Sequence, residues 1–300
     1  MLAPLRMVNE MRSGDIVRLL ILAAIWGGSF IFMRILAPVL GPVVTADLRV
    51  LIAGIALILY FHVIRFDPQW RRWWKQYLLI GAINSALPFC LFSFAAIHIP
   101  ASLSAILNSM SPLFGAIFSA IWLSERLSVR RIVGLLIGAV GVMLVVKVGV
   151  LKTDPLFGWA VAACVVAALC YGVAATYIKR FAVGVKPMGI AGASQLMAGI
   201  LLIPAVPLSL PTGVITFSVM AGMLAFALLC SAIAYLLYYR LIADVGPTKA
   251  LTVTFLMPVF GMIWGMIILK ETITFPMLAG TALIILGTGL VLTVGRPGRG

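Results

Sequence analysis

The chain of 300 residues is 63% hydrophobic and only 10% charged, and its mean hydropathy is +1.19. Soluble globular domains carry about 25% charged residues, so this composition excludes an ordinary soluble domain. Apolar runs of about 20 residues, the length of helix that crosses roughly 30 Å of hydrocarbon, recur along almost the whole chain. These runs lack the period-two alternation of membrane strands, so we expect an all-α integral membrane protein.

Ten membrane-spanning helices are predicted in chain order. After a tail at 1–15, we place the first five spans at 16–38, 42–64, 77–97, 101–123 and 132–148. Residues 65–75 mix basic and aromatic side chains and are predicted to form a loop at the lipid headgroups. After a linker at 149–156, we place the second five spans at 157–178, 188–208, 216–241, 247–269 and 275–294, followed by a tail at 295–300. The chain therefore divides into two five-helix units, 16–148 and 157–294.

The distribution of Lys and Arg predicts how these spans are oriented. With the N-terminus on the cytoplasmic side, 17 of the 22 Lys and Arg residues lie in cytoplasmic segments. The outer segments hold Arg34, Lys147, Lys152 and Lys270, and Arg49 lies within the second span. Cytoplasmic loops of membrane proteins are enriched in Lys and Arg, so both termini are predicted to be cytoplasmic. The net charge of +14 has the same explanation and does not require a nucleic-acid partner.

The fourth and ninth spans are copies of one pattern. A shift of 146 positions places Pro112 on Pro258 and Glu125 on Glu271. Shifts of 145 or 146 positions align further residues, namely Gly27 with Gly172, Arg34 with Lys179, Gly54 with Gly199, Ser85 with Ser231, Phe89 with Tyr235, Phe92 with Tyr238, Gly115 with Gly261, Gly134 with Gly280 and Gly141 with Gly287. Each copy has an odd number of spans, so the second copy is predicted to enter the membrane inverted, as in inverted-repeat transporters.

Two stretches resemble a known family. The run PLFGAIFSAIWLSERLSVRRIVGLLIGAVG, residues 112–141, resembles the EamA repeat of the drug/metabolite transporter superfamily, and a weaker copy begins PVFGMIWGMIILKE in the ninth span. The segment WGGSFIFMR, residues 26–34, followed by Arg49, is similar to the first two helices of that family. The family often has Gly before the acidic residue of the repeat, where this chain has Ser124 and Lys270.

The resemblance implies a fold and a function. It implies ten helices with both termini in the cytoplasm, and export of small metabolites, often amino acids. It also implies a central cavity lined mainly by helices three, four, eight and nine, with contributions from helices one and six. We accordingly expect the protein in a bacterial inner (plasma) membrane, with the lipid bilayer and a small-molecule substrate as its partners.

Polar and aromatic residues at mid-span positions are the candidate substrate-binding residues. The candidates are Trp26 and Tyr171 in spans one and six, Asn84, Ser85 and Phe92 in span three, Asn108 and Ser111 in span four, Ser231, Tyr235 and Tyr238 in span eight, and Thr254 in span nine. Polar groups at membrane depth need partners, and aromatic rings are less usual there than at the interface. These side chains therefore either line a cavity or bond within the helix bundle.

Prolines and glycines in the spans are expected to shape the backbone. Pro88, Pro112 and Pro258 are predicted to interrupt their helices, because proline lacks a backbone donor and clashes with the carbonyl four residues before it. Pro112 would in this way free the carbonyl of Asn108 for substrate. The glycines predicted to pack helices closely are Gly115, Gly134, Gly138, Gly261 and Gly265. We expect a monomer, with a dimer contact through the glycines of spans five and ten as the alternative.

Ionisable residues decide whether ion coupling is indicated. Asp47 and Arg49 lie near the outer part of the second span, two residues apart, so they face different ways on a helix. Ionisable groups within a membrane are functional candidates by default, unless they reach to the interface or pair with Arg34 or other neighbours. Glu125 and Glu271 lie at loop ends, where helix capping is the favoured role. No deep acidic residue indicates a proton relay. The four cysteines show no metal-ligand spacing, so neither a metal nor a cofactor is expected.

These observations predict a transporter that exports small metabolites, foremost neutral or aromatic amino acids, by alternating access of two inverted repeats. An exporter of another metabolite or drug, such as a nucleoside or a quaternary amine, is the alternative. An integral membrane enzyme is disfavoured, because no catalytic motif occurs and neither His62 nor His98 has a carboxylate or cysteine beside it in sequence. A channel is disfavoured, because its pore would show rings of polar or charged residues, which the predicted spans lack. Phosphorylated substrates would need more intramembrane cations than Arg49 alone.

Overall fold

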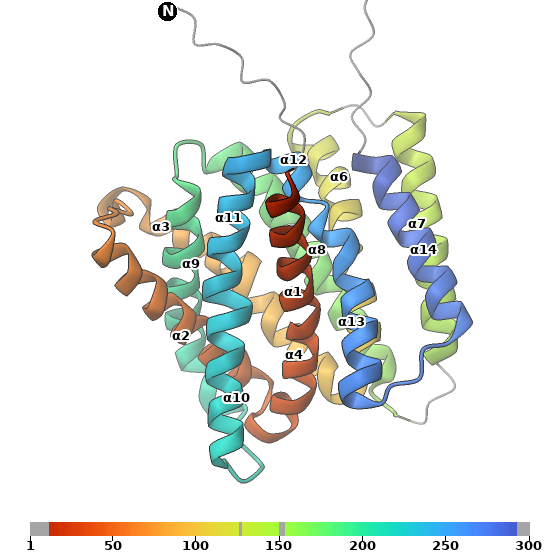
Figure 1. Ribbon diagram of the computed structural model, residues 1–300, viewed down its shortest axis with the longest axis horizontal. Coiled ribbons are helices and arrows are strands. Elements are labelled where there is room, and N and C mark those ends of the chain that lie inside the picture. The colour runs from red at the N-terminus through yellow and green to blue at the C-terminus, as the bar shows by residue number, and fades with distance from the viewer. Residues whose placement is uncertain (1–11, 126–127, 150–153, 293–300) are drawn as a thin grey trace, which may run out of the picture.

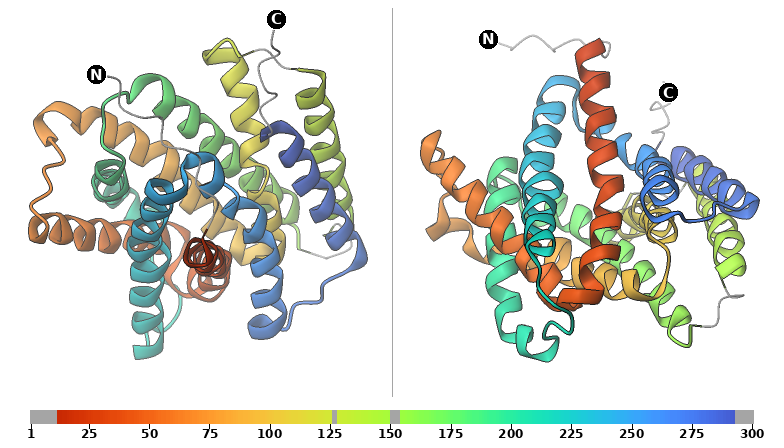
Figure 2. Two further views of the ribbon diagram at one scale, coloured as in Figure 1. Left: turned by 45° about the horizontal axis from the view of Figure 1, so that its top comes forward. Right: turned by 60° about the horizontal axis from the view of Figure 1, so that its bottom comes forward.

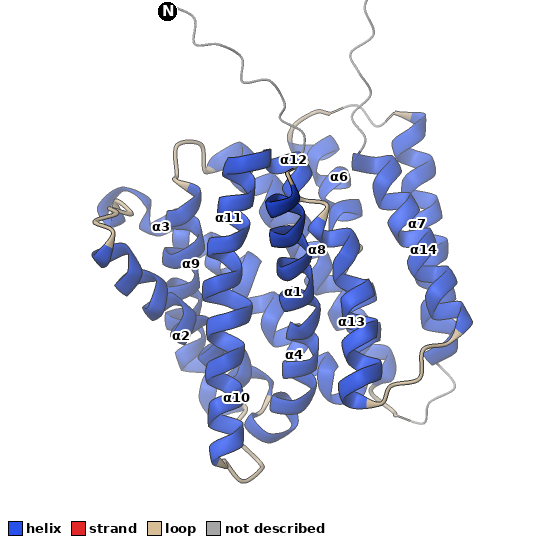
Figure 3. Cartoon of the chain, in the orientation of Figure 1, coloured by secondary structure: helices blue, strands red, loops and turns tan. Residues whose placement is uncertain are grey.

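The computed structural model describes residues 12–125, 128–149 and 154–292, and every regular element within them is helical (Figure 3). The first repeat comprises α1 (Ser13–Leu40), α2 (Pro42–Val63), α3 (Trp70–Gly81), η1 (Ala82–Ala86), α4 (Leu87–His98), α5 (Ala101–Asn108), α6 (Ser111–Trp122) and α7 (Val129–Gly149). The second comprises α8 (Phe157–Phe181), α9 (Pro187–Leu202), η2 (Ile203–Leu208), α10 (Phe217–Ala227), η3 (Leu228–Ile233), α11 (Ala234–Val245), α12 (Pro247–Ala250), α13 (Val253–Leu269) and α14 (Phe275–Leu292).

These elements make ten crossings of the bundle. Within the described residues, nine helical stretches are long and apolar enough to span a membrane. The remaining crossing is made by α12 and α13, of which α13 is a shorter apolar helix. The prediction of an all-α protein with ten helices in two five-helix repeats is therefore confirmed. As an even number of crossings requires, α1 begins and α14 ends on the same side of the bundle (Figure 1).

The third helix begins earlier than predicted. Residues 65–75 were expected to form a loop, but α3 starts at Trp70. Trp70 packs edge to face on Tyr77, with ring centroids 5.6 Å apart, and both lie in a cluster with Ile190 of α9. Trp70, Trp73 and Tyr77 recur at helical spacing, so they form one apolar face that packs on the rest of the protein while the basic residues between them stay exposed.

Helix α1 contacts helices of both repeats, namely α2, α4, α5, α10, α11 and α13. The pair formed by α7 and α14 lies at one edge of the bundle (Figures 1 and 2). Its two helices touch through glycines, since a Cβ on Gly134 would lie 2.6 Å from the carbonyl oxygen of Gly287 and one on Gly141 would lie 2.7 Å from that of Gly280. Contacts inside the chain thus account for these glycines.

The first helix of each repeat packs against the fourth helix of the other repeat. A Cβ on Gly27 of α1 would lie 2.9 Å from the backbone nitrogen of Gly261 in α13. A Cβ on Gly172 of α8 would lie 2.6 Å from the backbone nitrogen of Gly115 in α6. The same shift that aligns the two repeats relates these two contacts, so each repeat completes the packing of the other.

The third and eighth helices contain π-helical segments, η1 and η3, at equivalent positions of the two repeats. In η1 the N–H of Leu87 bonds to the carbonyl of Ala82, five residues before it. Pro88 is predicted to interrupt its helix, but the chain passes from η1 directly into α4 without a break. Ala234 holds the equivalent position after η3, so the π geometry there does not depend on a proline. Such segments occur frequently at functional sites.

Candidate substrate site

Two aromatic groups lie in the middle of the bundle. Trp26 of α1 contacts Tyr235 and Tyr238 of α11, with ring centroids 6.0 and 5.2 Å apart. Tyr171 of α8 stacks on Phe92 of α4 at 6.2 Å. The internal shift relates Trp26 to Tyr171 and Tyr238 to Phe92, so the two groups are pseudo-symmetric. All of these rings except Phe92 are partly exposed despite their central position, so protein side chains do not cover them completely.

Arg49 of α2 lies beside these groups and is only 4% exposed. Its Nε donates a hydrogen bond to Ser231 Oγ at 2.9 Å. Its guanidinium carbon lies 3.7 Å from the ring centroid of Phe89 and 4.6 Å from that of Phe226. The alternative that Arg49 reaches to the membrane interface is therefore wrong. Two phenyl rings and one hydroxyl hold a cation inside the bundle.

The guanidinium of Arg49 lies within electrostatic reach of both aromatic groups. Both Tyr171 and Tyr235 are close enough to interact with it electrostatically. The Tyr235 hydroxyl also faces the side chain of Asn84, which lies in η1. The structure thus brings together, around Arg49, the following candidates from the sequence: Trp26, Asn84, Phe92, Tyr171, Ser231, Tyr235 and Tyr238. We call these residues together with Arg49 the central group.

Ser85 and Asn108 each bury an oxygen that has no hydrogen-bond partner among the described residues. Ser85 is the equivalent of Ser231, which bonds to Arg49. The equivalent of Arg49 is Ser194, whose hydroxyl bonds to a carbonyl of its own helix. The pseudo-equivalent pair, Ser194 and Ser85, therefore lacks the charged contact that Arg49 makes with Ser231 across the two repeats.

The helix break in the first repeat lies where Pro112 predicted it. α5 ends at Asn108, and α6 begins at Ser111. The carbonyl of Asn108 accepts a hydrogen bond from Ser111 Oγ at 2.6 Å, which leaves one lone pair of this oxygen for a further donor. The Ser111 hydroxyl is thus engaged with the backbone, and the expected role of the Asn108 carbonyl in substrate binding stays a prediction.

The helix break in the second repeat precedes the proline, so the prediction that Pro258 interrupts its helix is wrong. Pro258 lies within α13, and the helices are separated by a turn after Ala250. Thr252 Oγ1 donates to the carbonyl of Lys249 at 2.7 Å, and Thr254 Oγ1 donates to that of Leu251 at 2.8 Å. These hydroxyls satisfy carbonyls at the end of the helix, which favours a turn at that point. They also direct the Thr254 side chain to the backbone.

Glu271 caps a helix of the other repeat. Its carboxylate accepts hydrogen bonds from the backbone N–H of Ala101 at 2.7 Å and of Ser102 at 3.0 Å, at the start of α5. A Cβ on Gly265 would lie 2.6 Å from this carboxylate, so the glycine leaves room for the cap. The capping role expected of Glu271 is therefore confirmed. Gly138, in α7, similarly faces the side chain of Leu113.

Glu125, the repeat equivalent of Glu271, forms ion pairs instead. Its carboxylate lies 2.7 Å from Lys179 Nζ and 3.1 Å from Arg131 Nη1. The hydrogen bond from Lys179, reinforced by Arg131, lowers the pKa of Glu125 from its ordinary value of 4.5. The two equivalent glutamates thus stabilise the two ends of the bundle by different means.

His98 lies beside a carboxylate that the sequence did not place near it. Its Nδ1 is 3.0 Å from Asp154 Oδ2. The N–H of Leu156 and the imidazole of His98 together lower the pKa of Asp154. Arg34 donates to the carbonyls of residues 96 and 97 at the same end of the bundle. This pair lies at the ends of helices, away from the central group.

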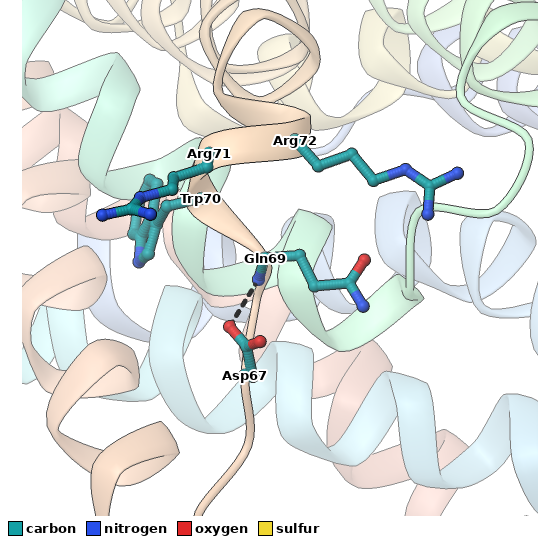
Figure 4. A pocket seen from close by; sticks show the side chains of 5 residues that line it. All are labelled: Asp67, Gln69, Trp70, Arg71 and Arg72. Atoms are coloured by element: carbon teal, nitrogen blue, oxygen red, sulfur yellow. Dashed lines mark hydrogen bonds between the residues drawn. The ribbon is translucent and has the colours of Figure 1, made fainter.

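A surface hollow of about 490 Å³ lies where α3 begins (Figure 4). Its lining residues are Asp67, Gln69, Trp70, Arg71 and Arg72. Asp67 accepts a hydrogen bond from the N–H of Gln69 at 2.7 Å, which shapes the turn into the helix. The hollow is at the surface and shares no residue with the central group.

Ten apolar helices in two inverted repeats, which pack across one another around a buried polar and aromatic group, define a polytopic membrane protein of the inverted-repeat transporter type. The model of the EamA-like transporter family matches residues 14–147 and 158–293. The chain therefore belongs to the EamA-like transporter family, and it is a membrane transporter.

Similar proteins are found in bacteria and archaea. An uncharacterized transporter of Archaeoglobus fulgidus is 22% identical over 269 residues, which cover 89% of this chain and 94% of the relative. The uncharacterized transporter YvbV of Bacillus subtilis is 23% identical over 287 residues, covering 91% and 89%. Protein PecM of Dickeya dadantii is 23% identical over 261 residues, covering 87% and 86%. One crystal structure shares the fold, with a TM-score of 0.65 at 19% identity over 94% of this chain and 98% of that chain.

Sequence reasoning missed the partners of Arg49. An arginine in an apolar run was a visible signal, and Arg49 was therefore a functional candidate. Its contacts with Ser231 and Phe226 join residues more than 170 positions apart, and no periodicity within one helix reveals such a pairing.

Proposed function

We propose that the protein exports small metabolites, foremost neutral or aromatic amino acids, across a bacterial inner membrane by alternating access of its two inverted repeats. The observation that carries this proposal is the central group. Trp26, Tyr171 and Tyr238 offer aromatic surface for an apolar side chain. Arg49 and Asn84 offer hydrogen bonds to polar groups next to that surface. Substrate sites near the bilayer midplane, at the interface of two repeats, are typical of inverted-repeat transporters.

The pseudo-symmetry of the packing supports alternating access. The contact of Gly27 with Gly261 and that of Gly172 with Gly115 are equivalent in the two repeats. Each repeat can therefore adopt the arrangement of the other with the same kind of helix contact. An exchange of these two arrangements would move the opening from one side of the membrane to the other, with both termini in the cytoplasm.

Counterflow in proteoliposomes tests this function. Vesicles preloaded with unlabelled amino acids, nucleosides or quaternary amines would be assayed for uptake of labelled L-phenylalanine or L-leucine, with and without a pH gradient. We expect uptake of the labelled amino acid only into vesicles preloaded with neutral or aromatic amino acids. Protein-free vesicles are the control for leakage. Failure of every amino acid to exchange would refute an amino-acid exporter.

A matched pair of variants connects transport with the central group. Tyr171→Ala removes a ring of that group, and we expect counterflow to slow by about two- to tenfold, since an aromatic contact contributes about 0.5–1.5 kcal/mol beyond burial. Tyr177→Ala changes the same helix at a tyrosine that bonds to Gln76 outside the group. We expect it to retain transport. Equal losses in both variants would count against the proposed site.

Export of a quaternary amine is the second candidate. Three aromatic rings, those of Trp26, Tyr235 and Tyr238, meet in one place, and such rings bind quaternary ammonium groups through cation–π interactions. The positive charge of Arg49 in the same group opposes a cationic ligand. Exchange of labelled choline without exchange of any amino acid would favour this candidate.

A further inference from the structure

We propose that Arg49 binds the carboxylate of the transported molecule, so that a free carboxylate is a requirement for recognition. The inference rests on the proposed function as a metabolite exporter and specifies its substrate class. It assigns one residue of the central group to one functional group of the ligand.

Arg49 has hydrogen-bonding capacity that the protein does not use. A guanidinium carries five N–H donors. Only the one on Nε has a partner among the described residues, the hydroxyl of Ser231. Neither Nη atom is completely enclosed by the described residues, although Arg49 as a whole is only 4% exposed. The Nη donors thus have no protein acceptor among the described residues and are available to an acceptor on a ligand.

Arg49 also has no anionic partner among the described residues. The ion pairs there involve other residues, at the ends of the helices. Asp47 is two positions earlier in the same helix, and side chains at that spacing do not face each other. A charge at membrane depth is costly without a counter-ion, and the rings of Phe89 and Phe226 compensate only part of that cost. An anionic group on the ligand would complete the compensation.

The unused donors match a carboxylate best. The Nη and Nε donors of arginine form a planar fork that binds the two oxygens of a carboxylate. The repeat equivalent of Arg49 is Ser194, so the central group holds a single cation, which suits one monoanionic group better than a phosphate dianion. Around it, Trp26 and Tyr238 present partly exposed rings to the remainder of the ligand.

Ser231 acts as a positioning residue. Its bond to Nε fixes the orientation of the guanidinium and comes from η3, the π-helical segment of the second repeat. The hydrogen bond between Arg49 and Ser231 thus connects α2 of one repeat with η3 of the other. We expect Ser231→Ala to weaken carboxylate binding while it preserves the preference for carboxylates over amides.

Wild-type protein tests the requirement without any substitution. Phenylpyruvate keeps the carboxylate of L-phenylalanine, whereas phenylalaninamide and phenethylamine lack it. We expect phenylpyruvate to compete with labelled L-phenylalanine in counterflow and to raise the melting temperature of the detergent-solubilised protein. We expect the two compounds without a carboxylate to bind at least about tenfold more weakly, as for loss of a charge-assisted hydrogen bond.

Variants assign the requirement to Arg49. Arg49→Gln should abolish the melting-temperature shift by phenylpyruvate, and Arg49→Lys should retain part of it. Arg34→Gln is the matched control. Arg34 is also an arginine of a membrane helix, α1, but it donates to backbone carbonyls at the end of α4, away from the central group. We expect this control to keep the full shift. A folded Arg49→Gln protein that binds phenylpyruvate like wild type would overturn the inference.

The outcomes separate this inference from the proposed function. Exchange of amino acids together with equally strong binding of amides or amines overturns the inference and leaves the exporter standing. Absence of exchange, with a carboxylate-specific melting shift that Arg49→Gln removes, supports the site and refutes the amino-acid exporter. No shift with any carboxylate, or an equal shift with chloride or inorganic phosphate, overturns the inference.

Discussion

Ser124 and Lys270 show how a single position can keep a turn with an unfavourable residue. They occupy the place where the family often has Gly, and both adopt left-handed backbone conformations, with φ of 54° and 55°. The turn they make is closed by bonds from Glu125 N–H to the carbonyl of Ser119 and from Glu271 N–H to that of Gly265. The left-handed conformation costs a non-glycine residue roughly 1–2 kcal/mol.

Substitution of these residues by glycine should therefore stabilise the protein. We expect Ser124→Gly and Lys270→Gly each to raise the unfolding free energy by about 1 kcal/mol, measured as a higher melting temperature in detergent. Ser119→Gly makes the same chemical change inside α6, where glycine costs about 0.5–1 kcal/mol, and should lower the melting temperature. Shifts of the same sign at Ser119 and Ser124 would contradict the argument.

The cap at Glu271 yields a second prediction at this scale. Glu271→Ala leaves the N–H groups of Ala101 and Ser102 without their acceptor, so we expect a loss of about 1–2 kcal/mol of stability. Glu125→Ala, at the equivalent position, removes exposed ion pairs and should cost less than about 1 kcal/mol. Chemical denaturation of both variants in the same detergent would compare them. A larger loss at Glu125 would be inconsistent with the cap.

At the scale of elements, proline position does not determine where the helices break. Pro112 lies at the start of α6 beside a break, whereas Pro258 lies inside α13 and Pro88 follows a π-helical segment. In the second repeat the break coincides with local hydroxyl–carbonyl bonds, those of Thr252 and Thr254, which favour a turn. The two copies of one sequence pattern thus differ in backbone course.

Contact between α7 and α14 depends on backbone approach at their glycines. A Cβ on Gly287 would lie 2.7 Å from the backbone nitrogen of Gly138, so we expect Gly287→Ala to cost about 1–3 kcal/mol. Gly289, in the same helix, has open space at its Cβ position. Gly289→Ala should be neutral or stabilise by up to about 1 kcal/mol. Melting temperatures of the two variants would distinguish them, and equal effects would argue against the glycine contact.

At the scale of the whole molecule, the ten crossings and the distribution of Lys and Arg predict which loops face each compartment. In a variant whose four native cysteines are replaced by alanine, Thr212→Cys should react with a membrane-impermeant maleimide added outside the cell. Ser128→Cys should react only after the membrane is permeabilised, because the basic segments near it are predicted to be cytoplasmic. The opposite labelling pattern would reverse the orientation proposed for the protein.

The number of spans and the two-repeat organisation could be predicted from the sequence, because length, hydropathy and repeat spacing are properties of consecutive residues. The sequence also selected most members of the central group, since Trp26, Tyr171 and Tyr235 are unusual at membrane depth. The partners of Arg49, the hydrogen bond to the carbonyl of Asn108 and the position of the second helix break could not be predicted in this way. These features depend on contacts between distant segments and on competing local hydrogen bonds, which the order of residues along one helix does not specify.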